Sequence, residues 1–428
     1  MIIEFSVRNF LSIKDEVTLS FLAVSKNKNN LLFPVDNGKY HLYPVNVIYG
    51  ANASGKTNVL KALYNFKRLI LNSYRQEAGK KISEYKPFKL DTESRTKPVF
   101  FEIEFVVNKI RHLYNVEFLH DRIVQEELSF YPEGRKARYF LRTEDKVVYG
   151  KSYTGDRKSV ETFLLPNRLF LSVSANSTND ILKGVYRFFF DIMHYNFANS
   201  IDLAMSFTIA TIKKEGDQFK NLILHLMKSA DITIEDIKLQ KHYPAILSNM
   251  VKNNETNNYI DKFSKLMPYM GHTVYINEKP SDNIEHLSLS DEESLGTLKL
   301  FELAAFLYRV LRTGSALIID EFNSSLHPLL SKMIVEMFCD PVINKHHAQL
   351  LVTTHDVSFL DALILDREQI WFTEKNKFGV TQLFSLDEFD KNLVRNGAKH
   401  SRPYLDGRFD AVPDINLDGL REVIHAEE

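Results

Sequence analysis

The stretch Gly50-Ala51-Asn52-Ala53-Ser54-Gly55-Lys56-Thr57 matches the phosphate-binding pattern G-x-x-x-x-G-K-[ST] without a mismatch. Its glycines let backbone N–H groups turn towards phosphate oxygens, and a helix starting there adds a favourable dipole. Lys56 is expected to reach the terminal phosphates, and the Thr57 hydroxyl is expected to ligate Mg²⁺. The eight residues therefore predict a nucleotide site.

The sequence on either side of this loop supports the prediction. The apolar run from Val45 to Tyr49 precedes it, as a buried strand would. After it, apolar residues recur near helical spacing at Val59, Leu60, Leu63, Phe66 and Ile70. The N-K-x-D sequence of guanine-specific proteins is absent, since neither Asn344-Lys345 nor Asn376-Lys377 has an Asp two positions after its lysine. The nucleotide is therefore expected to be ATP.

Strand and helix patterns alternate around this loop. Period-2 segments occur at residues 3–8 and, punctuated by turns, from 99 to 149, where they predict antiparallel hairpins. Strand-like runs at 316–319 and 349–353 alternate with helical segments at 298–312 and 329–338, which indicates a wound α/β sheet. We expect an N-terminal lobe at 1–178, a mostly helical insertion without sustained heptads at 179–286, and a C-terminal lobe at 287–428.

Composition excludes several classes of protein. Lys plus Arg total 54 against 55 for Asp plus Glu, so nothing in the bulk charge indicates nucleic-acid binding. The single cysteine, Cys339, excludes a disulfide framework and a multi-cysteine zinc site. Glu4 and Arg8 interrupt the apolar stretch that a signal peptide would need, and no run approaches a membrane span. We therefore expect a soluble, cytoplasmic protein without membrane contact.

Three later segments carry residue types suited to phosphate chemistry. The apolar strand from Leu317 ends in Asp320, suited to the Mg²⁺ shell, and Glu321, suited to polarising a water. His355 follows the next strand, from which it could contact a γ-phosphate. Ser294 and Gly296 open a helix, and such an N-terminus binds anions.

In this order, these elements resemble the ABC-type ATPases of the SMC, RecF and OLD group. The similarity is closer to the prokaryotic stand-alone ATPases of the RloA and abortive-infection kind. These share an opening like Arg8-Asn9-Phe10-Leu11-Ser12, an E-S-x-G-T signature like Glu293 to Thr297, and D-E followed by S-L-H-P. They also share a tail like the segment from Tyr404 to Pro413. The resemblance implies an ABC-type head in which the wound sheet is joined by an antiparallel β subdomain.

The resemblance also implies a role for each matching residue. Ser294 and Gly296 correspond to the signature motif, Asp320 to Walker B, Glu321 to the catalytic base and His355 to the switch histidine. Asn176 stands where the Q-loop glutamine is usual and would be a third group near Mg²⁺. In such ATPases the signature closes over ATP bound by a second subunit, so at least a homodimer holding two ATP molecules is implied, with a higher oligomer left open.

Three functions follow from these observations. The first is an ATP-driven sensor or regulator in phage defence that controls a separately encoded effector, for example a Toprim-type nuclease. The second is a DNA-repair ATPase of the RecF or SMC kind that clamps DNA. The third is a self-sufficient OLD-like nuclease; its Toprim domain would need about 100 residues after the switch histidine by family resemblance, and 73 follow His355.

Two weaker signals bear on nucleic acid. The stretch from Arg135 to Lys158 is rich in basic residues, which is typical of a solvated hairpin surface and, alternatively, of a nucleic-acid contact. Arg395 and His400 have the R-x4-H spacing of some ribonucleases, but Gly397 and its surroundings indicate a loop. We expect no second catalytic site from either stretch.

Overall fold

The computed structural model describes residues 1–24, 31–144, 146–175, 178–195, 201–242, 265–361, 365–389, 399–409 and 411–412. The chain forms two compact units. The first comprises Met1–His194, Leu311–Phe322 and Ile334–Glu428, and the second comprises Tyr195–Val310 and Asn323–Met333. The three-part division expected from the sequence stays a prediction.

A wound sheet forms the centre of the first unit, as predicted. Its order is β11-β15-β16-β5-β17-β18, with bounds Met193–Tyr195, Ala316–Ile319, Gln349–Thr353, Val45–Gly50, Ile370–Lys375 and Thr381–Ser385. The pairs β15–β16, β16–β5 and β5–β17 are parallel, and β18 is antiparallel to β17. Every residue of β5, β15 and β16 is buried, as in a parallel sheet covered on both faces. The carboxyl ends of these three strands therefore meet at one edge.

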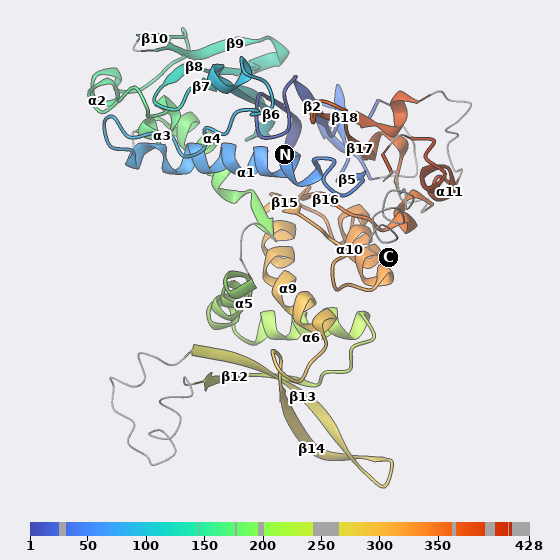
Figure 1. Ribbon diagram of the computed structural model, residues 1–428. Helices are drawn as coiled ribbons and strands as arrows, with labels where there is room; N and C mark the ends of the chain where they lie inside the picture. The colour runs from blue at the N-terminus through green and yellow to red at the C-terminus, as the bar shows by residue number, and fades with distance from the viewer. Residues whose placement is uncertain are drawn as a thin grey trace, which may run out of the picture. The chain divides into compact units, whose positions relative to one another are not determined.

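The predicted hairpins form a second sheet in the same unit. Seven antiparallel strands follow the order β10-β9-β8-β7-β6-β1-β2, with bounds Lys146–Tyr149, Ala137–Thr143, Ile123–Phe130, Ile110–Phe118, Val99–Val107, Ile2–Arg8 and Val17–Ser20. Helix α1 (Lys56–Asn72) lies along this sheet (Figure 1). Its Phe66 ring packs against Phe101 and Tyr114 with centroids 5.1 and 5.7 Å apart. The helix after the phosphate loop is thus anchored to the sheet by aromatic packing.

Smaller elements complete the first unit. A two-stranded sheet pairs β3 (Phe33–Val35) with β4 (Tyr40–Leu42). Its remaining α-helices are α2 (Arg157–Thr162), α3 (Phe170–Ser174), α4 (Asp180–Asp191) and α11 (Ser401–Leu405). Short 3-10 turns lie at Ser73–Arg75, Ser94–Thr96, Pro132–Gly134, Val357–Leu360, Arg367–Gln369 and Leu386–Glu388.

The second unit joins helices to a small sheet. In the part of this unit that the structure describes, the helices are α5 (Ile201–Glu215) and α6 (Asp217–Ser229), with most of α9 (Leu295–Thr313) and the first half of α10 (Pro328–Cys339). Thr208 of α5 donates a hydrogen bond to Phe301 O of α9, and Phe219 of α6 packs on Tyr308. No helix in the described ranges is long and apolar enough to cross a membrane.

The expectation of a mostly helical insertion is wrong for residues 236–242 and 265–286. Strands β12 (Asp236–His242), β13 (Lys265–Ile276) and β14 (Lys279–Ser288) form a three-stranded antiparallel sheet there. Much of β14 is exposed, so its sequence lacks the apolar alternation that identifies a half-buried strand. Cross-strand pairing, which local pattern does not report, decides the structure of this stretch.

Candidate functional site

The phosphate loop connects β5 to α1 and packs against two threonines. Gly50 and Gly55 have φ values of 150° and 116°, which favour glycine. A Cβ on Gly50 would lie 2.5 Å from Thr373 O, and one on Gly55 would lie 2.1 Å from Thr381 Oγ1. Both glycines are therefore required by the strands β17 and β18 behind the loop as well as by the turn itself.

Hydroxyl groups brace this loop from behind. Thr381 Oγ1 donates to Ser54 O over 2.8 Å and lies 2.7 Å from Ser12 Oγ. Asn58 Nδ2 donates to the same Ser12 oxygen, and Ser54 Oγ lies 2.6 Å from Thr373 Oγ1. The opening motif thus reaches the phosphate loop through Ser12. Sequence reasoning missed Thr373 and Thr381, because nothing in their local pattern marks them.

Lys56 is held inside the loop. Its Nζ donates to Gly50 O over 2.8 Å and to Ala51 O over 3.0 Å, and the residue is 7% exposed. Burial lowers the Lys56 pKa to about 8, although the charges of Asp320 and Glu321 oppose this shift. The ammonium is therefore directed into the loop that would surround the phosphates.

One threonine hydroxyl organises the two acidic residues after β15. Thr353 Oγ1 donates to Asp320 Oδ1 over 2.6 Å and accepts from the Glu321 N–H over 2.8 Å. Asp320 also accepts from Thr57 Oγ1 over 3.2 Å. The phosphate loop and the segment after β15 therefore meet at this carboxylate. Glu321 is exposed and has a left-handed φ of 50°. Sequence reasoning missed Thr353, the last residue of β16, because its position beside Asp320 depends on the pairing of two distant strands.

His355 lies two residues beyond Thr353 and is exposed. Partial burial and the charge of Lys56 lower its pKa, while Glu321 raises it. The imidazole therefore lies within electrostatic range of both groups. Tyr49 of β5 donates to Asp356 O over 2.9 Å, which holds the backbone next to the histidine.

The donor set suits Mg²⁺. The Thr57 hydroxyl and Asp320 carboxylate are hard oxygen donors in hydrogen-bond contact, and Mg²⁺ is usually held by one or two such groups together with phosphates and water. The described residues contain no group of three or more His, Cys, Asp or Glu side chains that could hold a metal by themselves. Asn176, the third expected metal residue, lies outside the described residues, so its role stays a prediction.

The signature segment belongs to the second unit. Ser294 Oγ accepts from the Thr297 N–H over 3.1 Å and so caps the first turn of α9. Ser294 is exposed, and Leu295 beside it is 68% exposed. Gly296 lies against Ser325, whose carbonyl oxygen a Cβ there would approach at 3.4 Å. Within this unit the signature and the S-L-H-P segment, from Ser325 to Pro328, are thus neighbours.

The tail motif packs against the central sheet of the first unit. Tyr404 of α11 packs against Tyr49 and Phe372, with centroids 5.7 and 5.6 Å away. Burial raises its pKa, and a hydrogen bond from the Gly50 backbone opposes that shift. Ser401 donates through its N–H and hydroxyl to Asp361. The tail therefore supports the strand that carries the phosphate loop and the segment that follows His355.

The R-x4-H spacing finds no support in the described residues. His400 is buried and packs edge-on against Phe409 of the tail. Arg395 lies outside the described residues. The position of His400 is that of a core residue.

The basic stretch from Arg135 to Lys158 includes an arginine that is not at the surface. Arg142 is 1% exposed, lies beside the buried Glu126 and donates to the carbonyls of Leu165 and Pro166. Arg138 pairs with Glu127 over 3.0 Å. The expectation of a basic surface over this stretch is therefore wrong for Arg142, whose side chain forms part of the interior.

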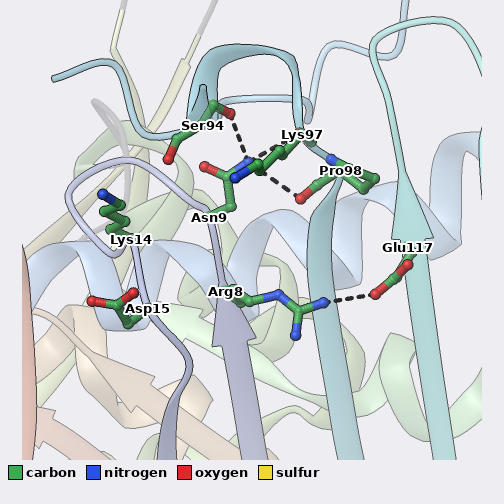
Figure 2. A pocket seen from close by; sticks show the side chains of 8 residues that line it. All are labelled: Arg8, Asn9, Lys14, Asp15, Ser94, Lys97, Pro98 and Glu117. Carbon is green, nitrogen blue, oxygen red and sulfur yellow. Dashed lines mark hydrogen bonds and ion pairs between the residues drawn. The ribbon is translucent and has the colours of Figure 1, made fainter. Parts of the chain in front are cut away.

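A polar cavity of about 270 Å³ lies at the opening motif (Figure 2). Asn9 there has a left-handed φ, and its amide donates to three carbonyls, those of Ser94, Lys97 and Pro98. Arg8 pairs with Glu117 over 2.7 Å. These groups bind each other, so the cavity is a structural feature of the opening motif.

A buried parallel sheet carrying a G-x-x-x-x-G-K-T loop and an acidic pair at one edge defines a P-loop nucleotide-binding protein. Residues 45–361 match the family described as "AAA domain, putative AbiEii toxin, Type IV TA system". The match includes the phosphate loop, the signature, Asp320, Glu321 and His355, and the chain belongs to this family.

Solved structures similar to this chain include three SMC heads. An SMC head bound to the C-terminal winged-helix domain of ScpA has 14% identity and a TM-score of 0.43, with 90% of this chain and 97% of that chain covered. The Thermotoga maritima SMC head domain has 14% identity and a TM-score of 0.40, with 90% and 98% covered. The Pyrococcus furiosus SMC head with an extended coiled coil, bound to the C-terminal domain of ScpA, has 12% identity and a TM-score of 0.35, with 90% and 96% covered. No curated protein matches the sequence.

Proposed function

We propose that this protein is a Mg²⁺-dependent ATPase that works as a homodimer, with two ATP molecules bound between the two heads. Its role is that of a sensor or regulator in prokaryotic antiphage defence, where it controls a separately encoded effector. The network that joins Thr57, Asp320 and Glu321 through Thr353 carries the ATPase proposal. The family description, which names a putative AbiEii toxin and a type IV TA system, supports the setting in defence.

Each residue of the proposed site has its own role in the hydrolysis of ATP. Lys56 binds the terminal phosphates, and Thr57 and Asp320 hold Mg²⁺, which neutralises phosphate charge when bound. Glu321 takes a proton from the water whose oxygen attacks the γ-phosphorus. The bond to the bridging oxygen breaks, and ADP leaves with that electron pair. In this proposal His355 donates a hydrogen bond to the transferred group.

The signature supports an assembled site. Ser294 presents a capped helix N-terminus at the protein surface, a location suited to binding an anion. The exposed Leu295 beside it suits a surface that another protein covers. In the proposed dimer, Ser294 and Gly296 of one subunit complete the ATP site formed by Lys56 and Glu321 of the other.

Mixing two inactive variants tests this arrangement. Ser294→Arg blocks the signature, and Lys56→Ala removes the cation from the phosphate loop. Each variant alone is expected to lose ATP hydrolysis, whereas a mixed dimer retains one site with a normal phosphate loop and a normal signature. Partial activity should therefore return on mixing.

Calorimetry should show that Ser294→Arg still binds ATP and that Lys56→Ala does not. Dimer formation in the mixture is checked by sedimentation. Confirmed mixed dimers without any recovered activity would refute the composite site, and ATP hydrolysis by Lys56→Ala alone would refute the role of the phosphate loop.

A further inference from the structure

The connection between β14 and the signature is a closed turn. Strand β14 ends at Ser288, whose N–H donates to Glu292 Oε2 over 2.6 Å and whose hydroxyl donates to Asp291 over 2.8 Å. The Glu292 N–H in turn donates to Ser288 O. The turn therefore transmits the position of the sheet to the residues that follow it.

Glu293, the first residue of the signature, is tied to the same sheet by its side chain. His272 Nε2 of β13 lies 2.5 Å from Glu293 Oε1, so the imidazole donates to the carboxylate. The Glu293 side chain is 9% exposed. A carboxylate so little hydrated needs a partner, because leaving it unpaired costs free energy. His272 therefore determines where Glu293 lies.

The residues after Glu293 link its position to other parts of the second unit. Ser294 follows Glu293 directly and caps α9. Gly296 lies against Ser325, and Lys299 Nζ donates to Ser324 Oγ over 2.5 Å. A shift of Glu293 would move the signature relative to the S-L-H-P segment beside it.

We propose that His272 is a positioning residue for the composite ATP site, fixing the signature to the β12–β14 sheet through Glu293. The proposal rests on the proposed function, in which Ser294 completes the site of the other subunit. It gives the sheet a regulatory role, because a protein bound to the sheet would alter turnover in the partner's site. ATP binding by the phosphate loop of the same chain would not change.

Replacing the histidine tests this role. His272→Ala is expected to reduce kcat for ATP by between about tenfold and a hundredfold, the range in which a misplacement of about 1 Å acts. The affinity of the chain for ATP should stay unchanged in calorimetry. His272→Lys, which can still pair with Glu293, should restore part of kcat. Because Glu293→Ala removes the same contact, combining it with His272→Ala should add little further loss.

His286→Ala is the matched control. His286 lies on β14 of the same sheet but contacts Asp236 over 3.3 Å rather than Glu293. Its replacement should leave kcat nearly unchanged, because its side chain contacts Asp236 and not the signature. An equal loss in both variants, with both folded by circular dichroism, would show a general effect of the sheet and overturn the assignment.

Mixing shows where the defect acts. Combined with Lys56→Ala chains, His272→Ala chains should regain activity, because one composite site then has an intact phosphate loop and an intact signature. If Ser294→Arg is rescued in this way and His272→Ala is not, the positioning role is wrong while the composite site stands. If neither is rescued, the proposed function itself fails.

Discussion

The phosphate loop and the signature are two halves of one proposed site, and the protein holds them in different ways. In the first half, Lys56 and Asp320 are each 7% exposed. In the second, Ser294 and Leu295 lie on the surface. A buried half can bind a nucleotide by itself, whereas an exposed half acts only when a ligand is brought to it by another surface. This difference is what an assembled ATP site requires.

The two halves are also stabilised by different groups. Hydroxyls of Thr353, Thr373 and Thr381, from three strands of the central sheet, hold the phosphate loop and the acidic pair. The imidazole–carboxylate contact from His272 to Glu293, together with the hydrogen-bonded turn after Ser288, ties the signature to its sheet. Changes in the first half should therefore affect chemistry and nucleotide binding, and changes in the second should affect assembly and turnover.

The largest effect is expected from Glu321→Gln. The amide cannot accept a proton from water, so the rate of ATP hydrolysis should fall by about 10²–10⁴, the usual contribution of a general base. ATP binding should persist, because the side chain is exposed and outside the phosphate loop. Single-turnover kinetics and calorimetry measure the two quantities. Hydrolysis near the unmodified rate would show that Glu321 is not the base. It would also remove the catalytic role assigned to the phosphate-loop half of the site.

A smaller effect is expected from Thr353→Val, which keeps the shape of the side chain and removes its hydroxyl. Asp320 then loses the 2.6 Å hydrogen bond from this hydroxyl, and the Glu321 N–H loses Thr353 as its acceptor. Turnover should fall by about 10- to 100-fold through misplacement of the acidic pair.

Thr208→Val is the control for that change. It removes another buried hydroxyl, which donates to Phe301 O in the second unit. This variant should lose stability in thermal unfolding by about 1 kcal/mol, the usual contribution of one hydrogen bond, with turnover nearly unchanged. Equal losses of turnover in the two variants would remove the distinction between the two halves.

The smallest effect concerns pH. Burial lowers the Lys56 pKa to about 8 in the free protein. Bound phosphates favour the charged amine, so the pKa in the complex is higher and binding takes up a proton between the two values. Affinity for ATP is therefore complete below about pH 8 and falls as pH rises, by at most about tenfold for each pH unit.

Calorimetry from pH 7 to pH 9.5 measures this dependence. Lys56→Arg should abolish it, because the guanidinium stays charged throughout the range. The same dependence in the Arg variant would assign the titration to another group. The signature variants should keep the dependence of the unmodified protein, which separates the two halves once more.

The sequence by itself determined the central features of the nucleotide unit. The phosphate loop is eight consecutive residues between a buried strand and an amphipathic helix, so backbone conformation and hydrophobic period identify it without distant contacts. The strands β15 and β16 were predicted for the same reason, since each is a short apolar run followed by polar residues. The seven-stranded antiparallel sheet was predicted from the regular alternation of apolar and polar residues along its strands.

Only the tertiary structure decided what surrounds these features. Thr353 meets Asp320, and Thr381 meets Ser12 and Ser54, across pairings between strands far apart in the chain. The β12–β14 sheet lacks a clear apolar period, so cross-strand contacts rather than local pattern give it its form. A short polar side chain shows its partner only once the fold has brought the two together, because its hydrogen bond depends on position to within tenths of an ångström and leaves no period in the sequence.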